Sequence, residues 1–104
     1  MHRISAALLS SLAVVTLANV ASAADAGNGE KLARRWCVSC HVVAADQRQG
    51  NTQADPFSAM AKLPGLDAGK LALYLLLPHP KMPDMNLSRS EAADLAAYIA
   101  KQGR

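Results

Sequence analysis

Apolar residues recur at helical spacing in several segments of the chain, and no segment alternates between apolar and polar positions as a half-buried strand does. The first pattern covers residues 25–36, begins with an aspartate that can cap a helix, and places Leu32, Ala33 and Trp36 on one face. Gly29 lies inside this pattern, where glycine costs about 1 kcal/mol relative to alanine. This glycine indicates either a close crossing with another helix or a frayed helix start.

Two further helices are predicted after a polar loop over residues 42–54. The first is short and covers residues 55–62, because Pro56 suits the first turn of a helix. The second covers residues 68–77 and ends before Pro78, since the residue that precedes a proline avoids the helical conformation. Leucines lie nearly all round this second helix, which predicts that it is buried.

The last helix begins at a capping box, in which Ser88 and Glu91 stand three residues apart ahead of an apolar run. Gly103 ends it. A proline-rich loop over residues 78–86 separates it from the preceding helix. Since every segment has the pattern of a helix or a loop, the sequence predicts an all-α domain.

Residues 1–23 have the pattern of a cleaved signal peptide. Arg3 supplies the positive start, residues 4–20 are apolar, and residues 21–23 form a small-x-small cleavage site before Ala24. The apolar stretch is short and contains several serines, which argues against an uncleaved membrane anchor. The sequence therefore predicts export, with the periplasm as the natural location.

The rest of the chain, residues 24–104, is predicted to be one small domain. Its net charge is +2, because the leader contributes only Arg3 to the +3 of the whole chain. The basic residues are scattered, which excludes the class of nucleic-acid-binding proteins that recognise their target through a basic patch. A domain of about 80 residues usually needs a disulfide, a metal or a cofactor to complete its core.

The cysteines indicate which of these the domain uses. Both cysteines of the chain lie in the segment C-V-S-C-H, residues 37–41. Two thiols three residues apart project from one face of a helical turn, and from there both can add to the two vinyl groups on one edge of a porphyrin. The histidine that follows then lies under the ring, where Nε2 can ligate iron. The sequence thus predicts one covalent haem c on Cys37 and Cys40, with His41 as an axial ligand.

Two other uses of paired cysteines fit less well. A redox dithiol of the thioredoxin kind requires a βαβ context, and no strands are predicted. A zinc site requires a second pair of cysteine or histidine ligands, which the chain lacks. Covalent haem attachment also agrees with export, because it takes place in an extracytoplasmic compartment.

Taken together, these segments resemble the small bacterial class I c-type cytochromes. The resemblance rests on Gly29, eight residues before Cys37, and on three sequence motifs: C-V-S-C-H at residues 37–41, P-H-P-K-M-P at residues 78–83, and L-S-R-S-E-A-A-D-L-A-A-Y-I at residues 87–99. It implies a cytochrome c-like domain of three to four helices wrapped around one covalently bound haem.

The resemblance also implies a contact between the first and last helices. Their close crossing would set Gly29 and Ala33 against Leu95 and Tyr98. In this family a Pro-x-Leu turn accepts a hydrogen bond from the axial histidine. That turn has no clear counterpart here, and Pro56 is the nearest candidate.

The sixth iron ligand has three candidates. The family carries an axial methionine, usually followed by proline, shortly before the last helix, and Met82 with Pro83 matches this. Prolines on both sides of Met82 would hold its loop firmly. Met85 is close enough to compete, although packing is its alternative role. His79 could also coordinate, although a histidine in such a loop more often lies at the surface.

Ligation by His41 and Met82 indicates electron transfer, because a soft thioether favours Fe(II) and two filled axial positions exclude substrates. We expect a soluble periplasmic electron carrier that cycles between Fe(III) and Fe(II) and is not an enzyme. It would be a monomer, would not insert stably in the membrane after leader cleavage, and would meet redox-protein donors and acceptors transiently at the haem edge. The alternatives are a dedicated haem c subunit of a periplasmic dehydrogenase, and a ligand-binding haem sensor or peroxidase.

Overall fold

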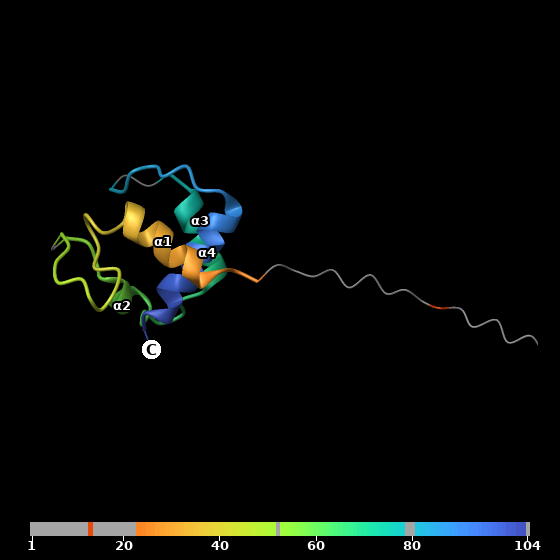
Figure 1. Ribbon diagram of the computed structural model, residues 1–104, viewed down its shortest axis with the longest axis horizontal. Helices are drawn as coiled ribbons and strands as arrows, with labels where there is room; N and C mark the ends of the chain where they lie inside the picture. The colour runs from red at the N-terminus through yellow and green to blue at the C-terminus, as the bar shows by residue number, and fades with distance from the viewer. Residues whose placement is uncertain (1–12, 14–22, 52, 79–80, 104) are drawn as a thin grey trace, which may run out of the picture.

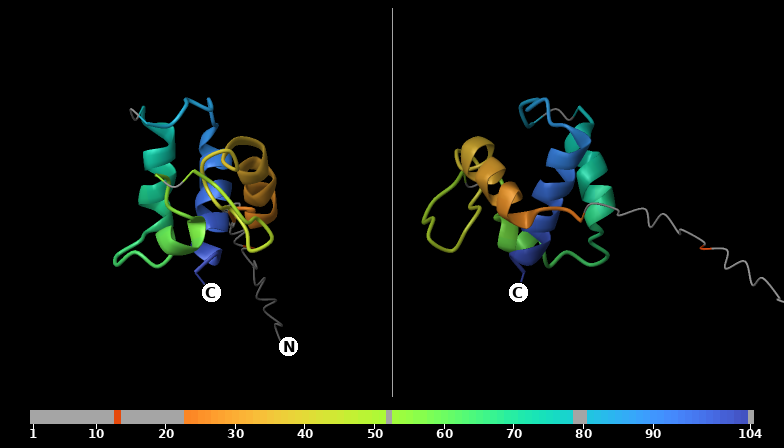
Figure 2. Two further views of the ribbon diagram at one scale, coloured as in Figure 1. Left: turned by 90° about the vertical axis from the view of Figure 1, so that its left-hand side faces the viewer. Right: turned by 45° about the vertical axis from the view of Figure 1, so that its right-hand side comes forward.

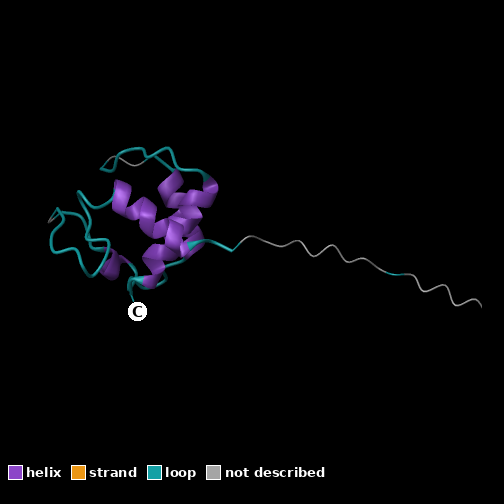
Figure 3. Cartoon of the chain, viewed as in Figure 1, coloured by secondary structure: helices purple, strands orange, loops and turns teal. Residues whose placement is uncertain are grey.

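The computed structural model describes residues 13, 23–51, 53–78 and 81–103. These ranges contain four helices joined by loops and no strand (Figures 1 and 3), which confirms the all-α prediction: α1 (Ala26–Trp36), α2 (Phe57–Met60), α3 (Ala68–Leu76) and α4 (Arg89–Lys101). No helix within these ranges is long and apolar enough to cross a bilayer. Apart from residues 13 and 23, the predicted leader lies outside the described residues.

Local capping explains where three of the helices begin. The Asp25 carboxylate accepts a hydrogen bond from the backbone of Asn28 at 3.0 Å, as expected for the residue before α1. Asp67 caps α3 in the same way, through the amide of Gly69. The predicted capping box before α4 is complete, with both reciprocal hydrogen bonds present between Ser88 and Glu91.

The short second helix is shorter than predicted. α2 spans only four residues, and Pro56 is its N-cap in an extended conformation rather than part of its first turn. After Met60 the chain continues in tight turns to Leu66. α3 ends at Leu76, one residue before the predicted end, because Leu77 is extended ahead of Pro78.

α4 is the central helix of the domain. In the part of the chain that the structure describes, α1, α2 and α3 all pack against α4, and no other pair of helices is in contact. Figure 2 shows α4 between α1 and α3 in its left-hand view. Leu95 and Ile99 of α4 are fully buried, together with Val43 from the loop after α1. These side chains form the centre of the hydrophobic core.

The crossing of α1 and α4 takes place at Gly29. A Cβ atom at this position would collide with the carbonyl oxygen of Asp94 and would lie 2.8 Å from Cβ of Tyr98. The Asp94 carboxylate strengthens the contact, since it accepts hydrogen bonds from Asp25 N at 2.7 Å and Asn28 Nδ2 at 2.9 Å. Gly29 therefore serves a close helix crossing, and the alternative of a frayed start is wrong.

The prediction that the third helix is buried is wrong. No residue of α3 is fully buried, and Leu73 is more than half exposed. Among the helices of the described residues, α3 contacts only α4, and its Leu71 and Leu75 pack against the core. Helix composition alone predicted burial on all sides, whereas one packing partner covers only one side.

Replacing Gly29 with alanine tests the crossing. The added methyl group meets backbone and Cβ atoms that cannot move independently, so we expect the free energy of unfolding to fall by about 1–3 kcal/mol. Gly27→Ala is the matched control, because its Cβ would approach only the Asp25 carboxylate, at 3.2 Å. That variant should keep its stability or gain up to about 1 kcal/mol. Equal urea unfolding curves for the two variants would contradict the close contact.

Candidate functional site

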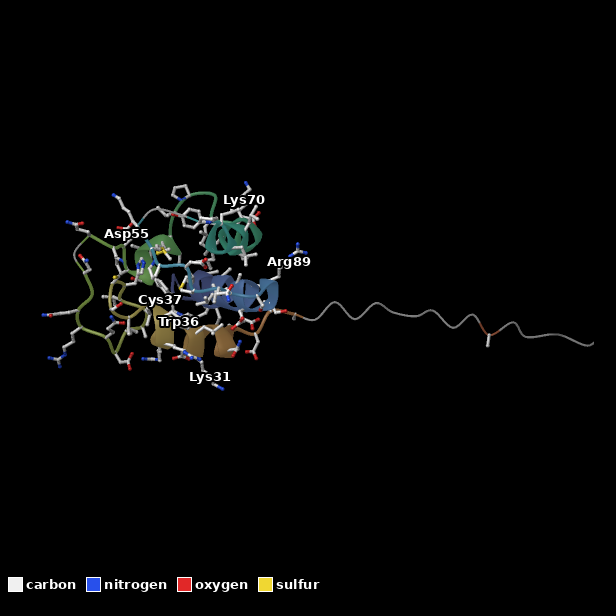
Figure 4. All side chains as sticks on the ribbon, turned by 90° about the horizontal axis from the view of Figure 1, so that it is seen from above. Lys31, Trp36, Cys37, Asp55, Lys70 and Arg89 are labelled. Atoms are coloured by element: carbon white, nitrogen blue, oxygen red, sulfur yellow. The ribbon has the colours of Figure 1, made fainter. Side chains whose placement is uncertain are left out.

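The cysteine segment continues directly from the end of α1. Cys37 is the C-cap of the helix, and its N–H donates to the Ala33 carbonyl at 2.8 Å. The next turn is closed by Cys40 N and His41 N, which both donate to the Cys37 carbonyl, at 3.2 and 2.8 Å. This turn places all three residues of the motif, Cys37, Cys40 and His41, at the C-terminal end of α1. Figure 4 shows Cys37 at this end, with Asp55 on the same side of the molecule.

The two cysteines differ in their surroundings. Both are free, but Cys37 is buried and Cys40 is exposed. Burial and, to a lesser extent, the neighbouring Cys40 raise the pKa of the Cys37 thiol to about 11. A redox dithiol of the thioredoxin kind needs a cysteine with a lowered pKa. Cys37 has the opposite property, which argues against a redox dithiol of this kind.

His41 is oriented by a single short hydrogen bond. Its Nδ1 lies 2.6 Å from the backbone carbonyl oxygen of Asp55. A carbonyl can only accept, so Nδ1 carries the proton and the lone pair is on Nε2. The acceptor, which the sequence did not identify, is thus the carbonyl of the residue directly before Pro56. Such a backbone partner fixes both the tautomer and the ring direction of a metal-binding histidine.

The chain after His41 folds back over the cysteine segment. Asn51 N donates to the Cys40 carbonyl at 2.8 Å, and Phe57 N donates to the Val42 carbonyl at 2.9 Å. Gly50 makes the approach possible, because a Cβ there would lie 2.7–3.0 Å from backbone atoms of residues 40–42. The backbone around His41 is thus held by later residues of the same loop.

Several of these groups were not singled out from the sequence. Residues 42–54 were predicted only as a polar loop, yet Gln47 binds the backbone of both Val43 and His41. Asp55 acts through its carbonyl, which every residue possesses, so its side chain gave no indication. A glutamine in a polar loop likewise carries no pattern that would distinguish it.

Aromatic rings connect His41 to α4. The ring of Phe57 lies 5.4 Å from the imidazole and 6.3 Å from the ring of Tyr98. The Tyr98 hydroxyl donates to the Val43 carbonyl at 2.7 Å. Tyr98 therefore fixes residues 42–56, which we call the return loop, to the same helix that crosses α1 at Gly29.

The two methionines of the proline loop have different environments. Met85 is only 9% exposed and belongs to the hydrophobic core, whereas Met82 is partly buried and packs at its edge. The loop turns directly after Met85, at Asn86, which has a left-handed φ of 51° and whose backbone N–H donates to the Asp84 carboxylate at 2.9 Å. His79 lies outside the described residues.

The loop that carries Met82 can be placed relative to the cysteine segment. The loop over residues 81–88 and the end of α1 lie at the same end of the domain (Figures 1 and 2). Met82 lines a cavity there with Leu75, Leu76 and Pro83. Two thiols, an imidazole Nε2, a thioether and apolar side chains are the groups that a covalently bound haem requires, so the residues fit that cofactor.

Comparison with known proteins gives an independent result. The chain is 52% identical over 88 residues to cytochrome c-552 of Bradyrhizobium diazoefficiens, and the alignment covers 85% of each chain. No family model and no solved structure matches the chain.

The contact of Tyr98 with the return loop can be tested by pH. Burial raises the pKa of Tyr98, so the stability linked to its protonated form is complete below pH 10 and is lost as the pH rises further. Tyr98→Phe should cost about 1 kcal/mol near pH 8, because the Val43 carbonyl loses its donor. Above about pH 10 the difference from the wild type should shrink. A difference in unfolding free energy that stays constant from pH 8 to 11 would contradict this contact.

Proposed function

The chain belongs to the class I c-type cytochromes, and we propose that it is a periplasmic electron carrier whose haem is attached to Cys37 and Cys40 and ligated by His41 and Met82. As a member of this family it is an electron-transfer protein with one covalent haem c and not an enzyme in its own right. When bound, the haem supplies the one-electron Fe(III)/Fe(II) couple. The residues of the chain have to hold it, orient its ligands and keep other molecules from the metal.

The proposal rests above all on the hydrogen bond of His41. Nδ1 donates to the Asp55 carbonyl at 2.6 Å, so the imidazole can offer only Nε2 to a metal. This bond also prevents the ring from turning, and it makes the imidazole a stronger donor. An axial ligand that keeps one direction in both oxidation states suits a site that must exchange electrons with little rearrangement.

The cysteines support attachment at two points with different exposure. Cys37 is buried against the core and Cys40 is exposed. Attachment at Cys37 would anchor the group within the domain, while attachment at Cys40 would leave one edge of it near the surface. We propose that this exposed edge is where redox partners dock transiently, and that the protein acts as a monomer.

Packing favours Met82 over Met85 as the sixth ligand. Met85 fills part of the core, and withdrawing a buried methionine from a core typically costs about 2–5 kcal/mol. Met82 is at the edge of the core and can present its sulfur without such a cost. Pro83 stiffens the chain directly after it, which limits the entropy lost when the thioether is fixed.

Export completes the proposal. We propose that residues 1–23 are a signal peptide that is removed before Ala24. The basic start, the apolar stretch and the small-residue cleavage site support this, and covalent haem attachment requires an extracytoplasmic compartment.

Cysteine substitutions test the attachment. The protein purified from the periplasm should have the mass of residues 24–104 plus one haem, and the haem should stay with the chain through acid–acetone extraction. Cys37→Ala and Cys40→Ala should each leave little holoprotein. Ser39→Ala is the matched control, because it lies exposed between them and should attach haem normally. Haem that is extracted from the wild type would rule out the thioether attachment.

Replacing Met82 tests the sixth ligand. The oxidised wild type should be low-spin and should show the weak long-wavelength band of sulfur on ferric haem. Met82→Ala should remove this band and allow cyanide and carbon monoxide to bind. It should also lower the reduction potential by a sizeable part of the roughly 0.8 V over which axial ligands act. Absorption spectroscopy and redox titration measure these changes.

Met85→Ala and His79→Ala are the controls for this experiment. Both should keep the band, although Met85→Ala should lower the melting temperature because the side chain is buried. A band that survives Met82→Ala and disappears in Met85→Ala would move the ligand to Met85. Ready binding of carbon monoxide by the wild type would contradict the carrier and favour a sensor or peroxidase.

A further inference from the structure

One side chain of the return loop, Gln47, contacts the backbone on both sides of His41. Its Oε1 accepts a hydrogen bond from Val43 N at 2.9 Å. Its Nε2 lies 2.7 Å from the carbonyl oxygen of His41 and 3.1 Å from that of Val38. The carbonyl of Gln49 is also within 2.9 Å. A single half-buried amide thus joins two residues of the cysteine segment, Val43 beyond it and its own loop.

The amide has only one orientation that satisfies these contacts. Three carbonyl oxygens surround Nε2, and one N–H group faces Oε1. If the amide were reversed, its oxygen would face three other oxygens and its nitrogen would face a donor. The two hydrogens of Nε2 are shared among the three carbonyls, and the shortest distance, 2.7 Å, is to His41.

These contacts bear directly on the direction of the imidazole. The His41 backbone is held at its N–H by the Cys37 carbonyl and at its carbonyl by Gln47. The ring is held at Nδ1 by the Asp55 carbonyl. Because the last bond joins two separate parts of the loop, its 2.6 Å length depends on the His41 backbone keeping its place.

We infer that Gln47 is a positioning residue for the axial histidine. It fixes the His41 backbone so that Nδ1 meets the Asp55 carbonyl and Nε2 keeps its direction toward the metal. This inference rests on the proposed function, since it requires His41 to be an iron ligand.

A residue that positions His41 should affect the reduction potential, whereas a residue that only stabilises the loop should not. A strong hydrogen bond at Nδ1 makes the imidazole a better donor, which favours the Fe(III) state. If the His41 backbone loosens, this bond lengthens and the preference weakens. Loss of the Gln47 amide should therefore raise the reduction potential, with Met82 ligation unchanged.

Gln47→Met tests this, because methionine keeps the length of the side chain but has no strong hydrogen-bonding groups. In a redox titration against a mediator of known potential, the equilibrium should shift toward the reduced protein by up to about tenfold. The long-wavelength sulfur band should remain, and the NMR resonances of the His41 ring should move. Gln49→Met is the matched control: that side chain is exposed, and its contact with Gln47 uses only the backbone carbonyl. It should behave as the wild type.

Gln47→Glu separates the two halves of the amide. Glutamate can still accept from Val43 N, but when ionised it cannot donate to the carbonyls of Val38 and His41. We expect it to shift the redox equilibrium in the same direction as Gln47→Met. The inference is overturned if both variants keep the wild-type potential and His41 resonances while only their melting temperatures fall.

It is also overturned if neither Gln47 variant yields holoprotein while Gln49→Met does, because Gln47 would then be needed for the fold itself. Failure of the proposed function would show differently. The wild type itself would lack the spectrum of histidine and methionine ligation, whatever the Gln47 variants did.

Discussion

The close crossing of α1 and α4 at Gly29 is the constraint on which the rest of the structure depends. It brings together the backbones of two helices that lie far apart in the sequence. The Asp94 carboxylate holds the start of α1 through its hydrogen bonds with Asp25 and Asn28. Cys37 stands at the other end of α1, two turns beyond the crossing. The position of the cysteine segment is therefore set by a rigid helix that is fixed at its distant end.

The same helix, α4, also fixes the return loop. The Cβ of Tyr98 lies at the crossing, and its hydroxyl donates to the Val43 carbonyl. One residue therefore connects the helix crossing with the return loop. Between these points the chain satisfies its backbone carbonyls with groups from its own loop, as buried polar groups require. The Cys40 carbonyl is bound by Asn51 N and the Val42 carbonyl by Phe57 N. The imidazole of His41 is thus oriented mainly by backbone atoms.

This arrangement explains what could be predicted from the sequence. Capping residues and the C-x-x-C-H spacing act within a few residues, so their chemistry is visible in the order of the side chains. Asp25 and the Ser88–Glu91 pair both cap the helices that they were expected to cap. Gly29 left two interpretations open from the sequence, and the resemblance to a known family, rather than the local pattern, pointed to the crossing.

The parts that were missed depend on tertiary contacts. The leucine pattern of α3 does not reveal how many elements pack against the helix. Among the helices of the described residues, its one packing partner is α4. The Asp55 carbonyl is a group that every residue carries, and Gln47 is one glutamine among several polar residues of a loop. Their roles follow only from the path of the chain, which local spacing does not determine.

The absence of charge in the core bears on the redox chemistry. Among the described residues, no charged side chain is buried, and the core beside the cysteine segment consists of aromatic rings and aliphatic side chains. An apolar environment disfavours the more highly charged state of a group enclosed in it. If His41 and Met82 ligate iron as proposed, such surroundings would favour Fe(II), and the thioether would act in the same direction. The hydrogen bond from His41 to the Asp55 carbonyl would act in the opposite direction, because it strengthens the imidazole as a donor. On this proposal the reduction potential is a balance between the apolar surroundings of the haem and the one backbone carbonyl that binds His41 Nδ1.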